Sequence, residues 1–253
     1  MLHEHVQFLN EGSSSLVDES VSALLSSPWL LSCDRPDISS LTLSQLELPI
    51  GSRDDFAAEI RGVLSKKECR HLIECTDALG YETATVSTHK GQRQALNENF
   101  RKSDRCMIDS DQIVEEVFSR IRHLLPKPSQ ILQLKQETQK WRLDSINRRL
   151  RFLRYDEGGF FNKHKDGYFE DETEEGVPRR SFVTIQIYLN DGGGVDFTGG
   201  GTSFWSSSGS SCTCTPEAGK VLLFSHPHLH SGDRLKGGRK YVIRSDIMYA
   251  KEV

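Results

Sequence analysis

Two segments of the sequence carry residue types that bind metal ions. In the first, FFNKHKDGY, His164 and Asp166 lie two positions apart. Residues i and i+2 of a strand point to the same face, so this imidazole and this carboxylate can bind one ion side by side. A third ligand must then come from elsewhere in the chain. The second segment, LLFSHPHLHSG over residues 222–232, offers three candidates: His226, His228 and His230.

Two histidines and one carboxylate form a facial triad, which leaves coordination positions open and is typical of non-haem Fe(II) oxygenases. A structural zinc site would instead be closed by four protein ligands. A lone HxD pair is common by chance, and three neighbouring histidines can be ordinary polar loop residues. The order of the residues favours a metal site: HxD after an incoming strand, then a distant histidine, then a basic residue in another strand.

The C-terminal half resembles the prolyl 4-hydroxylase-like branch of the 2-oxoglutarate/Fe(II)-dependent dioxygenases. The resemblance runs from about Asn147 to Tyr249 and rests on the stretches LRFLRYDEGGFFNKHKD, VTIQIYLND, GGGTSFW, AGKVLLFSHPHLHSG and LKGGRKYVIRSDIMY. It implies an enzyme that uses Fe(II), 2-oxoglutarate and O2 to hydroxylate a C–H bond, with succinate and CO2 as co-products. Prolyl or other residues of a polypeptide are the expected substrates, a small molecule is a further possibility, and ascorbate is expected to support activity.

The resemblance also assigns the metal ligands. His164 and Asp166 match the proximal pair of the family. His230 matches the distal ligand, because the family writes this step as histidine, a small or acidic residue, then glycine, and here the chain reads HSG. His228 is the alternative distal ligand, and we expect His226 to be a loop residue.

The cationic anchor for the remote carboxylate of 2-oxoglutarate lies nine or ten residues after the distal histidine in this family, which gives Arg239 or Lys240. We favour Lys240 as a catalytic and co-substrate-binding residue, because Lys240, Val242 and Arg244 then alternate inward along the last strand. Arg239 would point outward at the edge of that strand. A buried carboxylate needs such a cation together with hydrogen-bond donors.

Four more residues are expected to bind the co-substrate. Tyr188 matches the family tyrosine that donates to the remote carboxylate, and Thr184 shares its face of the strand. Tyr155 precedes the HxD pair and should point into the mouth of the barrel. Arg244 either assists the co-substrate or the primary substrate, or it pairs with Asp246 as a structural ion pair.

Two charged segments have open interpretations. The acidic run Glu170–Glu175 is a solvated loop or a lid over bound substrate, and the following Arg179 and Arg180 could simply neutralise it. Four arginines in the segment RRLRFLR could contact an acidic partner or a phosphate, but we expect them at solvent-facing and rim positions: Arg148, Arg149, Arg151 and Arg154.

The elements that position these residues follow from periodicity. From about residue 54 to residue 147 the pattern is mostly helical: Ser65 and Glu68 form a capping-box signature with Gly80 as the stop, and a second helix is expected from Asp111 to Leu125. From Asn147 the period becomes two. Strands are expected over Phe182–Leu189, Thr202–Trp205, Cys212–Thr215, Lys220–Phe224 and Lys240–Tyr249.

The fold class is therefore predicted as α+β, a double-stranded β-helix (jelly-roll) core with N-terminal supporting helices. We expect a Ser-rich, partly flexible extension over residues 1–50, a supporting helical region over 51–146 and the dioxygenase core over 147–253. The alternative is a catalytically silent or cupin-like barrel that binds a peptide or a metal.

Composition limits the remaining choices. The chain has 253 residues, 36% of them hydrophobic and 27% charged, with a net charge of −4. These values are typical of a soluble globular protein and argue against general nucleic-acid binding. No apolar run approaches the roughly 20 residues of a membrane span. The N-terminal segment lacks the pattern of a secretory signal, so we expect a cytoplasmic or nuclear location.

Overall fold

The computed structural model describes residues 36–49, 56–88, 93–131 and 140–252. Most of the predicted Ser-rich extension, residues 1–35 and residue 50, lies outside the described residues. Within its described part the chain forms a short 3-10 helix, η2 (Ile38–Ser40), and a strand, β1 (Leu43–Gln45).

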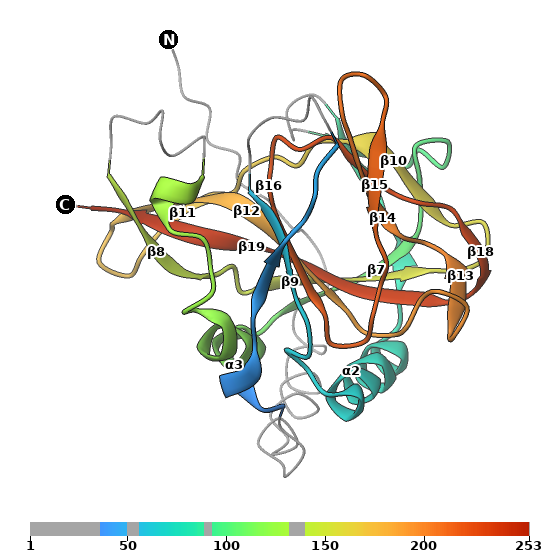
Figure 1. Cartoon of the computed structure of the whole chain (residues 1–253), viewed down its shortest axis with the longest axis horizontal. Helices are drawn as coiled ribbons and strands as arrows, with labels where there is room; N and C mark the ends of the chain where they lie inside the picture. The colour runs from blue at the N-terminus through green and yellow to red at the C-terminus, as the bar shows by residue number, and fades with distance from the viewer. Residues whose placement is uncertain (1–35, 50–55, 89–92, 132–139, 253) are drawn as a thin grey trace.

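The larger of two main sheets has ten strands. Besides β1 they are β2 (Ala57–Ile60), β3 (Glu82–Thr83), β7 (Asp104–Asp109), β8 (Trp141–Ile146), β9 (Arg149–Tyr155), β11 (Glu170–Glu172), β12 (Pro178–Tyr188), β16 (Val221–Ser225) and β19 (Lys240–Lys251). Their order is β1-β2-β16-β12-β19-β9-β7-β3, with β11 beside β12 and β8 beside β19. The long antiparallel pair of β12 and β19 forms the centre of this sheet (Figure 1).

The smaller sheet has five strands: β6 (Arg101–Lys102), β10 (Phe160–His164), β14 (Thr202–Trp205), β15 (Ser211–Cys214) and β17 (His230–Gly232). Their order is β15-β14-β17-β10-β6, with antiparallel neighbours throughout. Two short ribbons complete the strands: β4 (Val86–Thr88) with β5 (Arg93–Ala95), and β13 (Phe197–Gly199) with β18 (Leu235–Gly238).

Side chains alternate between two hydrophobic cores along the central strands. On β19, for example, Val242 belongs to the core between the two sheets, whereas Ile243 belongs to the core on the outer face of the larger sheet. The inner core is rich in aromatic rings, with Phe204 of the smaller sheet edge-on to Phe224 of the larger one at 5.2 Å between centroids. Two antiparallel sheets closed around one core form the predicted double-stranded β-helix.

Two helices, α2 (Lys66–Leu79) and α3 (Asp111–Ile121), brace the outer face of the larger sheet (Figure 1). The capping box of α2 is confirmed, and Gly80 ends that helix at φ 88°. The second helix is shorter than predicted, because the chain leaves it at Ile121 through a turn before Pro126. A buried ion pair joins the two helices, with Arg120 Nη2 2.6 Å from Glu68 Oε1.

The segment with a mostly helical pattern also supplies strands β2, β7 and β8, which the periodicity did not predict. Three of the four residues of β2, AAEI, have low intrinsic strand propensity. The four residues form a strand because they pair with the edge of β16, with Ala57 opposite Phe224 and Ile60 opposite Val221. Tertiary pairing therefore overrides local preference here; the division of the chain at residues 146–147 stays a prediction.

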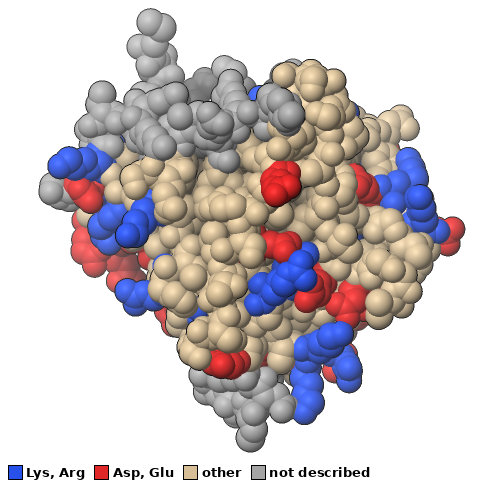
Figure 2. Space-filling view, in the orientation of Figure 1, with Lys and Arg blue, Asp and Glu red and all other residues tan. Residues whose placement is uncertain are grey.

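Charges of both signs are interspersed over the face of the molecule drawn in Figure 2. None of the helices in the described segments has the length and apolar character needed to span a membrane.

Candidate functional site

Adjacent strands of the smaller sheet bring the predicted metal ligands together. β10 ends at His164 and β17 begins at His230, and these two residues are opposite each other in the antiparallel pair. Asp166, two residues beyond β10, lies 3.8 Å from both rings, with Oδ1 facing His164 Nε2 and Oδ2 facing His230 Nε2. One ligand atom from each of the three residues lies within 4.8 Å of the others.

Backbone carbonyls fix the orientation of both imidazoles. His164 Nδ1 donates to the carbonyl of Asn162 at 2.7 Å, and His230 Nδ1 donates to the carbonyl of His228 at 3.0 Å. A carbonyl oxygen only accepts, so the proton is on Nδ1 and the lone pair is on Nε2. Both lone pairs belong to the nitrogen that faces Asp166, as metal ligation requires.

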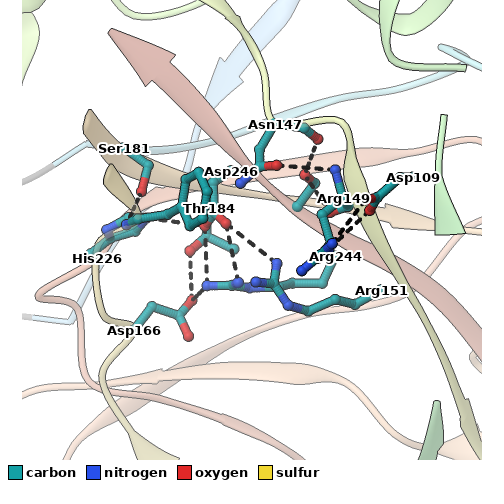
Figure 3. Close-up of polar contacts among 12 residues, drawn as sticks. Asp109, Asn147, Arg149, Arg151, Asp166, Ser181, Thr184, His226, Arg244 and Asp246 are labelled. Atoms are coloured by element: carbon teal, nitrogen blue, oxygen red, sulfur yellow. Dashed lines mark hydrogen bonds and ion pairs between the residues drawn. The ribbon is translucent and has the colours of Figure 1, made fainter. Parts of the chain in front are cut away.

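Two side chains hold one oxygen of Asp166 and leave the other available. Thr184 Oγ1 donates to Asp166 Oδ2 at 2.5 Å, and Arg244 Nη2 lies 3.4 Å from the same oxygen (Figure 3). Oδ1 remains free to face His164. The described contact of Thr184 is thus with the candidate metal ligand; its predicted contact with a co-substrate stays a prediction.

Electrostatics set the protonation of the triad. Burial lowers the pKa of His164 to about 4 and also lowers the pKa of His230. Burial alone would raise the pKa of Asp166, but the Arg244 guanidinium and the histidines hold it well below its usual range. At neutral pH the site therefore offers two neutral imidazoles and one carboxylate, a donor set that fits Fe(II).

Lys240 begins β19 and points into the barrel, as predicted. Its side chain is buried, its Nζ donates to the carbonyl of Gly200 at 2.5 Å, and the ring centroids of Tyr155 and Tyr188 are each 5.4 Å from Nζ. No carboxylate of the described residues lies within 4.0 Å of Nζ, and burial lowers the pKa of Lys240 to about 8. A buried ammonium without an acidic partner suits a carboxylate ligand.

Arg239 has the opposite environment. Its side chain is exposed and pairs with Asp156 at 2.5 Å, on the outside of the barrel. The alternation predicted for the last strand is therefore confirmed.

Tyr188 and Thr202 form the polar part of the pocket beside Lys240. The hydroxyl of Tyr188 donates to Thr202 Oγ1 at 2.8 Å, and Thr202 Oγ1 donates to Gln186 Oε1 at 3.2 Å. The sequence analysis did not single out Thr202. A signal was present, because this threonine follows three glycines and opens the strand-like run TSFW inside a stretch that resembles the family.

The comparisons with known proteins agree with this geometry. A family model described as the 2OG-Fe(II) oxygenase superfamily matches residues 150–245, which include the whole triad and Lys240. No curated protein matches the sequence.

Two solved structures share the fold of this oxygenase. A prolyl-4-hydroxylase from Pseudomonas putida is 19% identical, with a TM-score of 0.50 over 78% of this chain and 92% of that chain. A prolyl hydroxylase from Trichoplax adhaerens, in complex with a peptide fragment of the hypoxia inducible factor oxygen degradation domain, is 16% identical, with a TM-score of 0.50 over 77% of this chain and 83% of that chain. At these identities the similarity shows the double-stranded β-helix fold.

A charged network continues from the triad of the oxygenase. Arg244 lies between two carboxylates, with Nη2 3.4 Å from Asp166 Oδ2 and 3.1 Å from Asp246 Oδ1. Arg151 Nη1 reaches Asp246 Oδ2 at 3.4 Å (Figure 3). Of the roles considered for Arg244, the ion pair with Asp246 is present. Arg151 is not a simple rim residue, because it faces this network.

His226 is a loop residue, as predicted, but it is not exposed. It lies in the turn directly after β16 but is buried, and its Nε2 is 3.4 Å from Asp246 Oδ1. Burial opposes ionisation of Asp246, yet Arg244 and then His226 lower the pKa of that carboxyl to about 2. His226 therefore supports the network around Arg244, and it is outside the cluster of candidate metal ligands.

The structure also bears on two alternatives that the sequence left open: which histidine is the distal ligand, and what the acidic run does. His228 supplies its carbonyl to His230 and packs its ring 5.8 Å from Phe204, and it is outside the ligand cluster. This arrangement favours His230 as the distal ligand.

The first part of the acidic run forms β11 and pairs with β12. Asp171 lies 2.7 Å from Arg179 and Glu170 lies 2.5 Å from Arg180, so the arginines neutralise the first two acidic residues of the run. Its role as a lid stays a prediction.

Exposure shows which side of the site is open. The side chains of His164, Asp166, Arg244 and Arg151 are 14%, 13%, 16% and 22% exposed. Those of His230, His226 and Asp246 are 2–3% exposed. We call the first four residues the mouth of the site, and we call Lys240, Tyr188 and Thr202 the closed end.

Proposed function

We propose that this oxygenase hydroxylates a residue of a polypeptide, with prolyl residues as the first candidates, and forms succinate and CO2 from 2-oxoglutarate. One combination of observations carries the proposal. An open His-Asp-His triad and a buried lysine without an acidic partner face the interior of the same barrel. A metal-only or silent barrel has no need of that lysine.

In this proposal His164, Asp166 and His230 hold Fe(II). The bound iron supplies O2 activation and C–H cleavage, and the protein supplies geometry. The carbonyls of Asn162 and His228 keep both Nε2 lone pairs on the metal side. Thr184 and Arg244 occupy the second oxygen of Asp166, so that its carboxylate binds through a single oxygen.

The closed end orients the co-substrate. Lys240 pairs with the remote carboxylate of 2-oxoglutarate, and the Tyr188 hydroxyl turns from Thr202 to donate to the same group. The ring of Tyr155 is as close to Lys240 Nζ as the ring of Tyr188 is. The rings of Phe204 and Phe224 pack at 6.3 and 4.5 Å from the ring of His230 and shield that ligand from water.

The choice of a polypeptide substrate is supported by the two similar structures, both prolyl hydroxylases, one of them with a bound peptide. A fold accommodates many substrates, so the partially exposed mouth has to supply the selectivity. Stimulation by ascorbate, a small-molecule substrate and the cytoplasmic or nuclear location remain predictions.

Succinate formation tests the proposal. The purified chain is loaded with Fe(II) and 2-oxoglutarate under nitrogen, exposed to O2 with a library of proline-containing peptides, and assayed for succinate and for peptides that gain one oxygen atom. We expect both products from the wild type and from His228→Ala, and neither from His230→Ala. Absence of succinate from the wild type, with and without peptides, would refute the proposal.

A further inference from the structure

Arg101 lies beside the triad at the edge of the smaller sheet. Its guanidinium carbon is 4.7 Å from the ring centroid of Phe161, which stacks on the ring of His164 at 3.6 Å and an interplanar angle of 23°. Phe100 is edge-on to both rings. Arg101 is thus one aromatic ring away from a candidate iron ligand, on the partially exposed side of the site.

This arginine has no acidic partner in the described segments. Its Nε donates to Ser103 Oγ at 2.8 Å, and no carboxylate oxygen among the described residues lies within 4.0 Å of its guanidinium. Arg154, on the facing sheet, is in contrast paired with Asp104 at 3.1 Å. Burial lowers the pKa of Arg101, and the charges of Arg244 and Asp166 also act on it. A partly buried cation is favoured when an anion joins it.

The facing sheet adds two more cations. Arg151 and Arg244 are directly opposite each other on β9 and β19, an arrangement that is unfavourable for like charges. Both contact the same oxygen of Asp246, Oδ2: Arg151 Nη1 lies 3.4 Å from it and Arg244 Nη1 lies 3.3 Å from it. Burial and then the charge of Arg244 lower the pKa of Arg151 to about 10.

The mouth therefore has more cations than anions. With Arg101 beside them, its two arginines make three cations around two carboxylates, Asp166 and Asp246. Fe(II) and the 2-oxoglutarate dianion cancel each other's charge, so the pair leaves this excess in place. Lys240 already serves the remote carboxylate at the closed end.

We propose that the oxygenase selects peptides that carry an oxyanion next to the hydroxylated residue, and that Arg101 binds this group with help from Arg151. The inference rests on the proposed function and names the substrate class of the same site. A guanidinium held over an aromatic ring loses side-chain freedom, and its planar set of N–H donors suits the two oxygens of a carboxylate or a phosphate.

Peptide binding provides a test that needs no turnover. Short fluorescein-labelled peptides with a central proline, lysine or asparagine are flanked by glutamate, glutamine, phosphoserine or lysine. Their binding to the chain loaded with Mn(II) and 2-oxoglutarate under nitrogen is measured by fluorescence polarisation. We expect glutamate- or phosphoserine-flanked peptides to bind about ten- to a hundredfold more tightly than glutamine-flanked ones, and the two acidic arms distinguish carboxylate from phosphate.

Substitutions of Arg101 test whether this residue causes the preference for acidic flanks. Arg101→Gln should remove most of the preference for acidic flanks, and Arg101→Lys should keep part of it. Arg101→Glu should reverse the preference toward lysine-flanked peptides. The matched control is Arg234→Gln, because Arg234 stacks on the neighbouring Phe160 at 4.3 Å but is exposed; it should leave the preference unchanged.

Several outcomes would overturn the inference. Wild-type protein that binds glutamate- and glutamine-flanked peptides equally contradicts it, whatever the variants do. A rise in the Kd for 2-oxoglutarate in Arg101→Gln, with the peptide preference intact, would make Arg101 a co-substrate residue instead. Failure of the proposed function has a separate signature: no succinate from the wild type, with acidic peptides still bound in preference.

Discussion

The two ends of the oxygenase site use charge in opposite ways. At the closed end one buried ammonium, that of Lys240, lies among tyrosine rings and has no carboxylate partner in the described residues. At the mouth, Arg244 and Arg151 are partly exposed and share the carboxylate of Asp246. A buried, dry environment with one cation favours a single dicarboxylate strongly, whereas the charges of a wetter network are more screened and orient a ligand with less binding energy.

Removal of a triad residue should have the largest effect on activity, because the iron that the triad holds is needed for both the co-substrate and the substrate. In His230→Ala the site loses an imidazole that is directly opposite His164, and we expect iron-dependent succinate formation to fall at least about a thousandfold. Titration with Fe(II) under nitrogen checks the cause by showing weakened binding. His228→Ala keeps the carbonyl that orients His230 and should retain most activity; equal losses in both variants would contradict the ligand assignment.

Substitution of Lys240 tests the closed end alone. We expect Lys240→Ala to raise the KM for 2-oxoglutarate about ten- to a hundredfold while Fe(II) affinity stays unchanged, because a charge-assisted contact is lost in a buried pocket. Arg239→Ala is the matched control, since that side chain is exposed and pairs with Asp156. A larger change in KM for Arg239→Ala than for Lys240→Ala would place the anchor outside the barrel.

A change at Thr184 tests the mouth alone. Thr184→Val keeps the shape of the side chain but removes the hydroxyl that donates to Asp166 at 2.5 Å. We expect Fe(II) affinity to fall about ten- to a hundredfold, with little change in the KM for 2-oxoglutarate once the site is saturated with iron. If KM for 2-oxoglutarate changes and iron affinity does not, Thr184 contacts the co-substrate as the sequence first indicated.

The smallest effect that we expect is a pH dependence of 2-oxoglutarate affinity, caused by the titration of Lys240 at the closed end. Burial lowers the pKa of Lys240 to about 8, so the lysine is charged below that pH and neutral above it. The affinity for 2-oxoglutarate should be constant below about pH 8 and fall about tenfold per pH unit above it. Lys240→Arg should remove the fall, because a guanidinium stays protonated. An identical profile in Lys240→Arg would assign the titration to another group.

The closed end was largely predictable from the sequence. Period-two alternation placed Lys240 inside and Arg239 outside, and the structure confirms both positions. The HxD pair was found because ligand chemistry limits residue types and strand geometry limits their spacing, whereas the HSG segment was assigned through its resemblance to the family. The barrel itself follows from the same alternation.

The mouth was much less predictable. Arg101 and Arg151 lie on different sheets, and only the register of β6 with β10 and of β9 with β19 places Arg101 opposite Phe161 and Arg151 opposite Arg244. His226 was expected in a loop, but burial against Asp246 depends on the fold of β16 and β19. Long-range pairing likewise made a strand of AAEI in β2. Local periodicity carries no information on such contacts between distant segments.

Optical titration under nitrogen tests the central claim most directly. A 2-oxo acid that chelates Fe(II) gives a visible charge-transfer absorption, so the band reports that the triad and the closed end bind their ligands together. We predict that the wild type develops the band with one equivalent of Fe(II), that Lys240→Ala needs a large excess of 2-oxoglutarate, and that His230→Ala does not develop it. A wild-type protein without the band, or a His230→Ala variant with a band of full intensity, would contradict the account.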